Sequence, residues 1–183
     1  MVVEKLTYTV AQFQEFESLP ENADRILELI DGEIVEKMPS FTPSRIAIRI
    51  SYFLLQFTLS NGIGYVTGEA GGYVMAEGNV FNPDVGYISK ARLPEEPDRE
   101  VPIPPDLAVE VKSPTDSKRS MRRKAEKYLA SGTRLVWLVF PDEQTVEVYL
   151  ADKDVQTVGI DGVLDGGEVL PGFTFKVSDI FAR

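Results

Sequence analysis

A short strand-like segment carries the side chains best suited to chemistry. In "PPDLAVEVKSPTDSK", residues 104–118, every second residue from Leu107 to Val111 is apolar. Successive side chains of a strand point to opposite faces, so the alternation predicts a strand over 106–112 in which Glu110 and Lys112 share the polar face. The two residues would lie roughly 6.6 Å apart along the strand. This spacing suits metal-assisted hydrolysis, and it also suits a surface ion pair on a half-exposed strand.

The residue types that are absent restrict the chemistry further. The chain contains no cysteine and no histidine, which excludes thiolate and imidazole ligands, Ser-His-Asp and Cys-His catalysis and histidine-based nuclease sites. Hydrolysis would therefore depend on carboxylates, Lys, Tyr, Ser or a carboxylate-bound metal, and carboxylates prefer hard cations such as Mg²⁺ or Mn²⁺. One carboxylate holds such an ion poorly, so a second should come from a neighbouring strand. Asp84 in "NPDVGYI" is the best candidate.

A site of this composition would hydrolyse phosphodiester bonds. Asp84 and Glu110 would bind the ion, and Lys112 would orient water or neutralise developing charge. An acidic residue two positions before a lysine also arises by chance, and Asp116 and Lys118 form a second such pair. The two matches differ in position, because Glu110 lies in a strand with an apolar back face whereas Asp116 resembles a helix N-cap.

Length and composition predict a single domain over residues 1–183. A hydrophobic fraction of 43% is sufficient for a sizeable core. No apolar run approaches the length of a membrane span and no signal-peptide pattern is present, so we expect a cytoplasmic protein without membrane contact. The formal net charge of -10 opposes simple nucleic-acid binding. However, six of the nineteen basic residues are clustered, namely Lys118, Arg119, Arg122, Arg123, Lys124 and Lys127.

Hydrophobic periodicity and turn residues predict the elements that position these side chains. The expected helices cover residues 7–19, 44–60 and 116–130, the last capped by Thr115 or Asp116. The expected strands lie on both sides of Asp31-Gly32, within 64–88, at 106–112, at 134–140, at 145–151, and in short pieces near 161–167. The strand at 134–140 is apolar throughout and should be buried on both faces. Residues 90–105 contain five of the twelve prolines and should form an exposed loop.

Five blocks of sequence resemble the PD-(D/E)XK nuclease superfamily and, more narrowly, its Uma-two family of restriction-endonuclease relatives. The blocks, in order, are "ELIDGEIVEKMP", "NPDVGYI", "PPDLAVEVKSPTD", "KAEKYLASGTRLVWLVFP" and "LPGFTFKVSDIF". The resemblance covers nearly the whole chain. It implies a mixed α/β, restriction-endonuclease-like fold, with a central mixed β-sheet flanked by helices and extra β-hairpins. It also implies a Mg²⁺- or Mn²⁺-dependent DNA endonuclease, and a homodimer because two nicks on a duplex need two sites.

The resemblance assigns roles to the strand residues. It makes Asp84 and Glu110 metal ligands and Lys112 the catalytic lysine. Asp106 matches a characteristic family position, where it would support the metal or brace the strand. An Asp that follows Pro-Pro is equally common at the start of a strand.

The resemblance also points to residues outside that strand. Lys124 and Tyr128 lie four apart on the following helix, where related nucleases place a polar residue that faces the site. Glu28 and Glu33 match the family's N-terminal acidic block and would support the site. Four other residues of the basic cluster would contact phosphates or form a solvated helix face; they are Lys118, Arg119, Arg122 and Arg123.

Two alternatives to an active nuclease remain open from the sequence. The acidic net charge suits a catalytically silent nuclease-like fold that binds nucleic acid or a protein. An acidic interaction module without a nucleic-acid role would be favoured if another element covered the charged face of strand 106–112.

Overall fold

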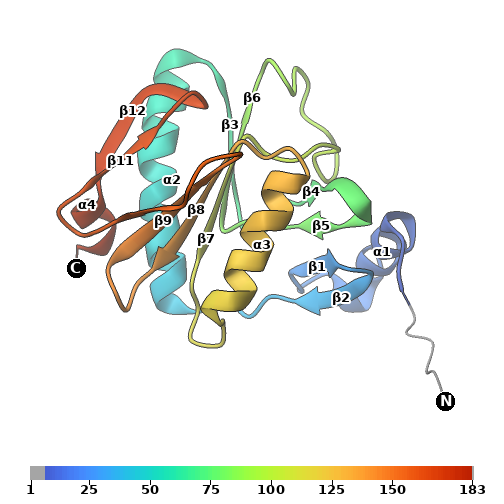
Figure 1. The fold of residues 1–183 in the computed structure, drawn as a ribbon. Helices are drawn as coiled ribbons and strands as arrows, with labels where there is room; N and C mark the ends of the chain where they lie inside the picture. The colour runs from blue at the N-terminus through green and yellow to red at the C-terminus, as the bar shows by residue number, and fades with distance from the viewer. Residues whose placement is uncertain (1–6, 183) are drawn as a thin grey trace.

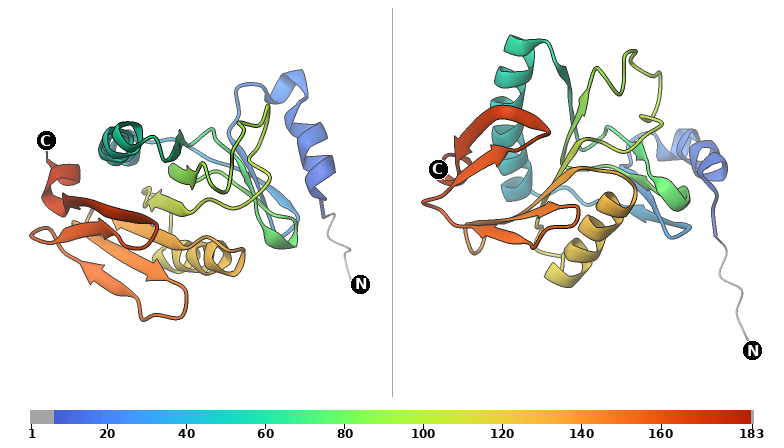
Figure 2. Two further views of the ribbon diagram at one scale, coloured as in Figure 1. Left: turned by 90° about the horizontal axis from the view of Figure 1, so that it is seen from above. Right: turned by 45° about the horizontal axis from the view of Figure 1, so that its top comes forward.

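The fold is built on a central sheet that separates two long helices. The computed structural model describes residues 7–182. Its six-stranded sheet has the order β10-β9-β8-β7-β6-β3, and helices α2 and α3 lie on opposite faces when the molecule is seen from above (Figure 2). The strands of this sheet are β3 (Gly64–Gly68), β6 (Val85–Ser89), β7 (Leu107–Val111), β8 (Leu135–Phe140), β9 (Thr145–Leu150) and β10 (Gln156–Val158). Strands β7 and β8 pair in parallel and the other neighbours pair antiparallel, which confirms the predicted mixed sheet.

Smaller elements surround this sheet (Figure 1). The helices are α1 (Val10–Glu17), α2 (Phe41–Asn61), α3 (Lys118–Ala130) and α4 (Val177–Phe181), with short 3-10 helices at Pro20–Asn22 and Ala76–Gly78. A second sheet of order β2-β1-β5-β4 contains β1 (Leu27–Ile30), β2 (Glu33–Glu36), β4 (Tyr73–Val74) and β5 (Val80–Phe81). The hairpin of β11 (Val163–Gly166) and β12 (Leu170–Lys176) completes the fold. None of the helices within residues 7–182 is both long and apolar enough to cross a membrane.

Strand β7 divides its side chains between two hydrophobic cores. Leu107, Val109 and Val111 pack in the core that contains α2, the β11–β12 hairpin and α4. Ala108 faces the other core, which α3 covers. Glu110 points to this same side, where it contacts Tyr128 of α3. The alternation predicted from the sequence therefore holds within the strand, and it turns Glu110 toward α3. The strand is not half-exposed, however, because all five of its residues are buried.

Helix α3 is the crossover between the parallel strands β7 and β8. A parallel connection has to return over one face of the sheet, so the helix packs directly on the two strands that it joins. Met121, Ala125 and Tyr128 form its buried stripe, at the helical spacing of an amphipathic face. Strand β8 is buried at all six positions, as predicted from its continuous apolar run.

Two predicted helix boundaries are wrong. The N-cap of α3 is Ser117, whose hydroxyl accepts a hydrogen bond from the Ser120 backbone, and not Thr115 or Asp116. The Asp116 carboxylate instead accepts a hydrogen bond from the Ser113 backbone and closes the turn before the helix. Helix α2 begins at Phe41, earlier than predicted. Pro43 is tolerated in its first turn, because an N–H group at that position would have no partner within the helix.

We predict that replacing Gly86 by Ala destabilises the central sheet. A Cβ atom at Gly86 would lie 2.7 Å from both the Thr67 Oγ1 and the Tyr73 hydroxyl oxygen, which are hydrogen-bonded to each other at 2.9 Å. Overpacking of this kind costs about 1–3 kcal/mol. Urea unfolding, followed through the fluorescence of the buried Trp137, would measure the loss.

Gly68 provides the matched control. It lies on the neighbouring strand β3, and a Cβ atom there would meet no heavy atom within 4 Å. Gly68→Ala should leave the unfolding midpoint close to that of the wild type. Equal midpoints for the two alanine variants would contradict the steric explanation.

Candidate active site

A cavity of about 620 Å³ lies between the β1–β2 hairpin, the N-terminal half of α2 and the N-terminal half of α3. Its walls include acidic and basic side chains from segments that are far apart in the sequence, namely Glu28, Lys37, Asp84, Glu110, Arg123 and Lys124. The cavity therefore brings together three of the acidic residues that the sequence singled out, Glu28, Asp84 and Glu110.

Five of these side chains form a line of alternating charge, which we call the charge row: Glu28, Lys124, Glu110, Lys37 and Asp84. Lys124 Nζ lies 2.8 Å from both Glu28 Oε1 and Glu110 Oε1. Lys37 Nζ lies 3.9 Å from Glu110 Oε2 and 2.7 Å from Asp84 Oδ1. Each ammonium group thus lies between two carboxylates.

Strand pairing places Asp84 beside Glu110. In the antiparallel β6–β7 ladder, Val85 is opposite Val109, so the next step brings Asp84 alongside Glu110. The Val111 backbone N–H also donates a hydrogen bond of 2.7 Å to Asp84 Oδ2. The predicted convergence of two carboxylates from neighbouring strands is therefore present in the geometry.

The surrounding structure fixes one oxygen of each of these two carboxylates. Glu110 Oε1 accepts hydrogen bonds from the Tyr128 hydroxyl at 2.8 Å and from Lys124. Asp84 Oδ2 is held by the Val111 backbone. The other oxygens, Glu110 Oε2 and Asp84 Oδ1, both face the Lys37 ammonium group. Both carboxylates are thus oriented with one oxygen toward a common point.

Glu28 joins the row from the second sheet. Leu27 and Leu29 pack against α1 in a small core, so Glu28 between them points to the opposite side of β1. There its Oε1 accepts a hydrogen bond of 2.7 Å from the Asn82 backbone N–H, in addition to the contact with Lys124. Glu28 is 3% exposed, so these bonds compensate for a charge removed from water.

Burial and mutual attraction set the protonation of the row. Burial alone would raise the pKa of Glu110, but Lys124 and Lys37 outweigh it and hold that pKa below its ordinary value. Burial and repulsion from Glu110 raise the pKa of Asp84, only partly offset by Lys37 and the Val111 backbone. For Lys37, attraction from Glu110 and Asp84 outweighs burial and raises the pKa. Glu110 and Lys37 are therefore charged at neutral pH.

The donor set fits a hard divalent cation. Asp84 Oδ1 and Glu110 Oε2 both face the Lys37 ammonium group, so the two oxygens already point toward a common cation. With all five groups ionised, the row has one excess negative charge, which favours a further cation. Within residues 7–182, no cluster of three or more acidic side chains is arranged to hold a metal. Two carboxylates are nevertheless sufficient for Mg²⁺, which commonly retains several water ligands.

The structure places Lys112 away from the charge row. The strand ends at Val111, so the alternation of faces does not extend to the next residue. Lys112 Nζ lies 3.2 Å from the Ser113 carbonyl oxygen and 3.7 Å from Asp142 Oδ2 in the β8–β9 turn. The ammonium group that lies within 4 Å of both Asp84 and Glu110 belongs to Lys37, which the sequence reasoning missed. Its only sequence signal is its position directly after the acidic block "GEIVE".

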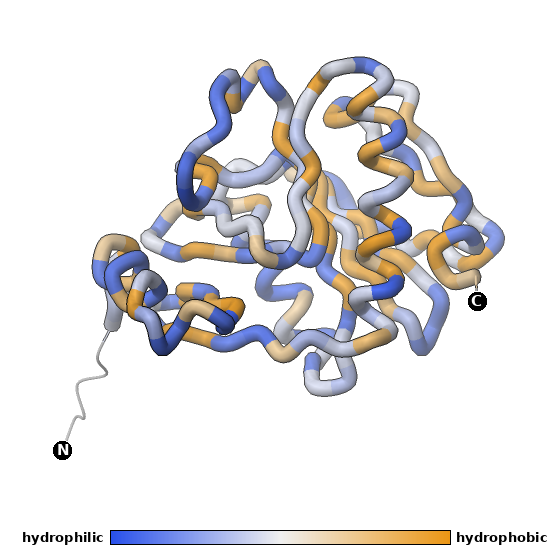
Figure 3. Tube along the Cα trace, turned by 180° about the vertical axis from the view of Figure 1, so that it is seen from behind, coloured by the Kyte–Doolittle hydropathy of each residue, from blue (hydrophilic) through white to orange (hydrophobic). Residues whose placement is uncertain are grey.

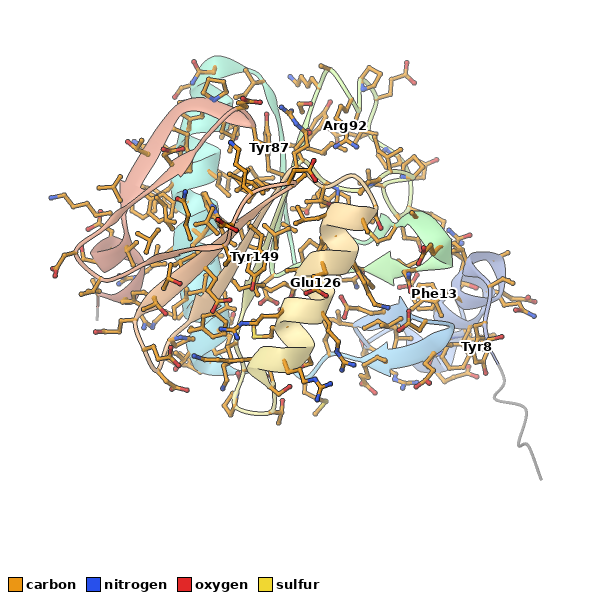
Figure 4. All side chains as sticks on the ribbon, viewed as in Figure 1. Tyr8, Phe13, Tyr87, Arg92, Glu126 and Tyr149 are labelled. Carbon is orange, nitrogen blue, oxygen red and sulfur yellow. The ribbon has the colours of Figure 1, made fainter. Side chains whose placement is uncertain are left out.

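Asp106 belongs to a separate cluster at the other end of β7. Its carboxylate accepts hydrogen bonds from Arg92 at 3.0 Å and from the Ser89 backbone at 2.8 Å, and Arg134 lies 3.7 Å away. Figure 4 shows Arg92 in the upper part of the molecule, above α3. These contacts brace β6, β7 and the start of β8. Glu33 lies in β2, opposite Ile30, and is not among the residues that line the cavity.

The basic cluster on α3 divides into paired and outward-facing groups. Lys118 forms an ion pair with Glu143, and Arg122 forms one with Glu147. Arg119 is exposed, and Arg123 lines the cavity. Arg123 is therefore the member best placed to meet an anion that enters the site.

Two comparisons with known proteins agree with this architecture. A family model described as "Uma2: Putative restriction endonuclease" matches residues 13–178. A crystal structure from Anabaena variabilis ATCC 29413, titled as "a putative nuclease belonging to DUF820", is similar with a TM-score of 0.81 and 24% sequence identity. The similarity covers 94% of this chain and 97% of that one. No curated protein matches the chain.

We predict that Lys124→Met strongly destabilises the fold. The substitution would remove the ion-pair partner of the buried Glu28 and one of the two ammonium groups beside Glu110. The loss of one partner from a buried ion pair costs about 3–5 kcal/mol. Chemical denaturation at neutral pH would measure the change.

Lys127→Met is the control on the same helix. Lys127 pairs with Asp31, whose side chain is 68% exposed, and a surface pair of this kind contributes at most about 1 kcal/mol. Similar losses for the two methionine variants would show that burial of the charge row does not determine its contribution to stability.

Proposed function

Because the chain belongs to the Uma2 family of restriction-endonuclease-like proteins, we propose that it is a metal-dependent endonuclease that hydrolyses phosphodiester bonds in DNA. The observation that carries the proposal is the convergence of Asp84 Oδ1 and Glu110 Oε2 on one point of the cavity. Mg²⁺ or Mn²⁺ at this point would supply electrophilic assistance to the phosphoryl group and lower the pKa of bound water.

The residues of the chain supply binding and orientation. Asp84 and Glu110 would hold the ion through the oxygens that face Lys37. Lys124 and Tyr128 keep Glu110 ionised and fixed by binding its other oxygen. Arg123, on the wall of the cavity, binds a phosphate of the substrate, and the exposed Arg119 extends this contact along the backbone.

Lys37 is the lysine that acts in this site. Its ammonium group lies beside the two oxygens that would hold the metal, so it would lie close to a phosphoryl group bound there. From there it neutralises charge that develops on the phosphoryl oxygens. Lys112, which pairs with Asp142, has the lesser role.

We predict metal-dependent cleavage of plasmid and linear duplex DNA that requires both acids. Asp84→Asn and Glu110→Gln should each reduce the rate by at least about 100-fold, because the ion loses a charged ligand. Asp154→Asn, at an exposed position on the surface, is the matched control and should cut as the wild type does. Unchanged cleavage in both site variants would refute the assignment.

The same assay separates the two lysines. Lys37→Met should lose about 100-fold in rate, whereas Lys112→Met should remain within a few-fold of the wild type. A larger loss of rate in Lys112→Met than in Lys37→Met would instead make Lys112 the catalytic lysine, as the sequence motif predicts. Mn²⁺ titration, read as an increase in melting temperature, provides a measurement independent of turnover, and the increase should disappear in Asp84→Asn.

A second function is a nuclease-like fold that binds nucleic acid or a protein without cutting it. The observation that favours it is the charge row itself, since the Lys37 ammonium group lies between the two converging carboxylates. This function requires metal-independent association and no cleavage with any divalent ion. Detectable cleavage would exclude it.

A further inference from the structure

The outer face of α2 carries five large apolar side chains that are exposed to solvent. The exposed fractions are 82% for Phe41, 68% for Ile48, 60% for Tyr52, 39% for Leu55 and 73% for Leu59. The inner face of the same helix is fully buried at Ile46, Ile50 and Leu54. Seen from behind, α2 lies in front of the sheet with apolar residues recurring along it (Figure 3). The helix is therefore apolar on two opposite sides, which a helix packed on one core does not require.

These exposed residues have the spacing of a helix that packs against another helix. Together with Arg45 they form the α2 seam, which comprises Phe41, Arg45, Ile48, Tyr52, Leu55 and Leu59. The steps between them alternate between four and three residues, and this is the seven-residue period by which two helices keep one stripe in contact. A flat or irregular partner would not require this regularity.

The exposed area is large enough for a stable interface. With about 200 Å² for a large side chain, the five apolar residues of the seam expose on the order of 600 Å². The largest apolar patch of a typical monomer is about 300–600 Å² and is often functional. A standard interface buries about 800 Å² from each partner, so the seam supplies most of one side of such an interface.

We propose that the α2 seam binds the α2 seam of a second copy of this chain, with the two helices antiparallel about a two-fold axis. A two-fold interface uses the same patch on both copies, and the seam is apolar at both ends. Phe41 would meet the partner's Leu59, and Ile48 would meet the partner's Tyr52.

The position of Arg45 selects the antiparallel arrangement. In a parallel pair Arg45 would lie opposite the partner's Arg45, and like charges in contact are destabilising. In the antiparallel pair it meets the partner's Leu55, against which its aliphatic stem can pack. Its guanidinium group is already held away from the seam, because Arg45 Nη1 donates a hydrogen bond of 2.7 Å to the Ala182 carbonyl oxygen.

The dimer would bring the two cavities close together. Ile48 belongs to the seam and also lines the cavity that contains the charge row. Residue 48 lies next to the centre of the seam, so each cavity would border the two-fold axis. Two neighbouring sites would suit the two strands of a duplex, and this consequence rests on the proposed nuclease function. The proposed interface itself does not rest on that function.

Sedimentation velocity tests the interface without reference to activity. The wild type should sediment as a dimer at micromolar concentration. The double variant Ile48→Glu/Leu59→Glu should sediment as a monomer, because its dimer dissociation constant should rise at least 100-fold. Ser60→Glu, on an exposed position of the same helix outside the seam, should remain a dimer. A monomeric wild type, or a dimer that both glutamates leave intact, would overturn the proposal. Far-UV circular dichroism would show that each variant is folded.

Disulfide trapping tests the antiparallel arrangement, since the chain has no cysteine of its own. A mixture of Phe41→Cys and Leu59→Cys proteins should form a cross-linked heterodimer on oxidation. Leu59→Cys alone should not cross-link, because the two copies of residue 59 would lie at opposite ends of the helix pair. Cross-linking of Leu59→Cys alone, without the heterodimer, would overturn the antiparallel geometry.

Discussion

The alternation of carboxylate and ammonium groups in the charge row is the constraint on which the rest of the site depends. A charge withdrawn from water is costly unless it is paired and hydrogen-bonded. Glu28, Glu110 and Asp84 meet this condition only because Lys124 and Lys37 lie between them. The β1–β2 hairpin, β6, β7 and α3 must therefore all be in place before any of these acids is stable in the cavity. The row consequently couples the second sheet to the central sheet.

The same arrangement explains how a stable cluster can also be a reactive one. The scaffold satisfies one oxygen of Glu110 through Tyr128 and one oxygen of Asp84 through the Val111 backbone. Their other oxygens both face Lys37, and in our proposal these two oxygens hold the metal ion. The Lys37 ammonium group offsets part of the repulsion between the two carboxylates and holds them with one oxygen each toward the same point. In this view Lys37 acts as a counter-ion that keeps the ligands in position.

Helix α2 connects the site with the outer surface. Its inner face belongs to the larger core, and its N-terminal turns form one wall of the cavity. Its outer face has the period of a helix-pairing stripe. One element thus determines the shape of the cavity and, in our proposal, the position of a second copy. Because Ile48 takes part in both, dimerisation and access to the site would be linked physically.

The sequence by itself determined the local features of this protein. The absence of histidine and cysteine restricted the chemistry to carboxylates and lysines, and the alternation in β7 turned Glu110 to the face that α3 covers. Neither inference depends on the family resemblance, because both follow from residue type and from periodicity. The mixed sheet and the restriction-endonuclease-like fold were also predicted correctly from the resemblance of the sequence blocks.

Only the tertiary structure decided which lysine meets the acids and which acids stand apart. Lys112 lies beyond the last residue of β7, where strand alternation no longer determines direction, and the β8–β9 turn provides its partner. Asp106 is drawn into the cluster with Arg92 and Arg134. Lys37 reaches the site because the β1–β2 hairpin folds beside β6 and β7, a contact between segments that are distant in the chain. Such contacts depend on packing across the whole domain, and no local pattern of residues records them.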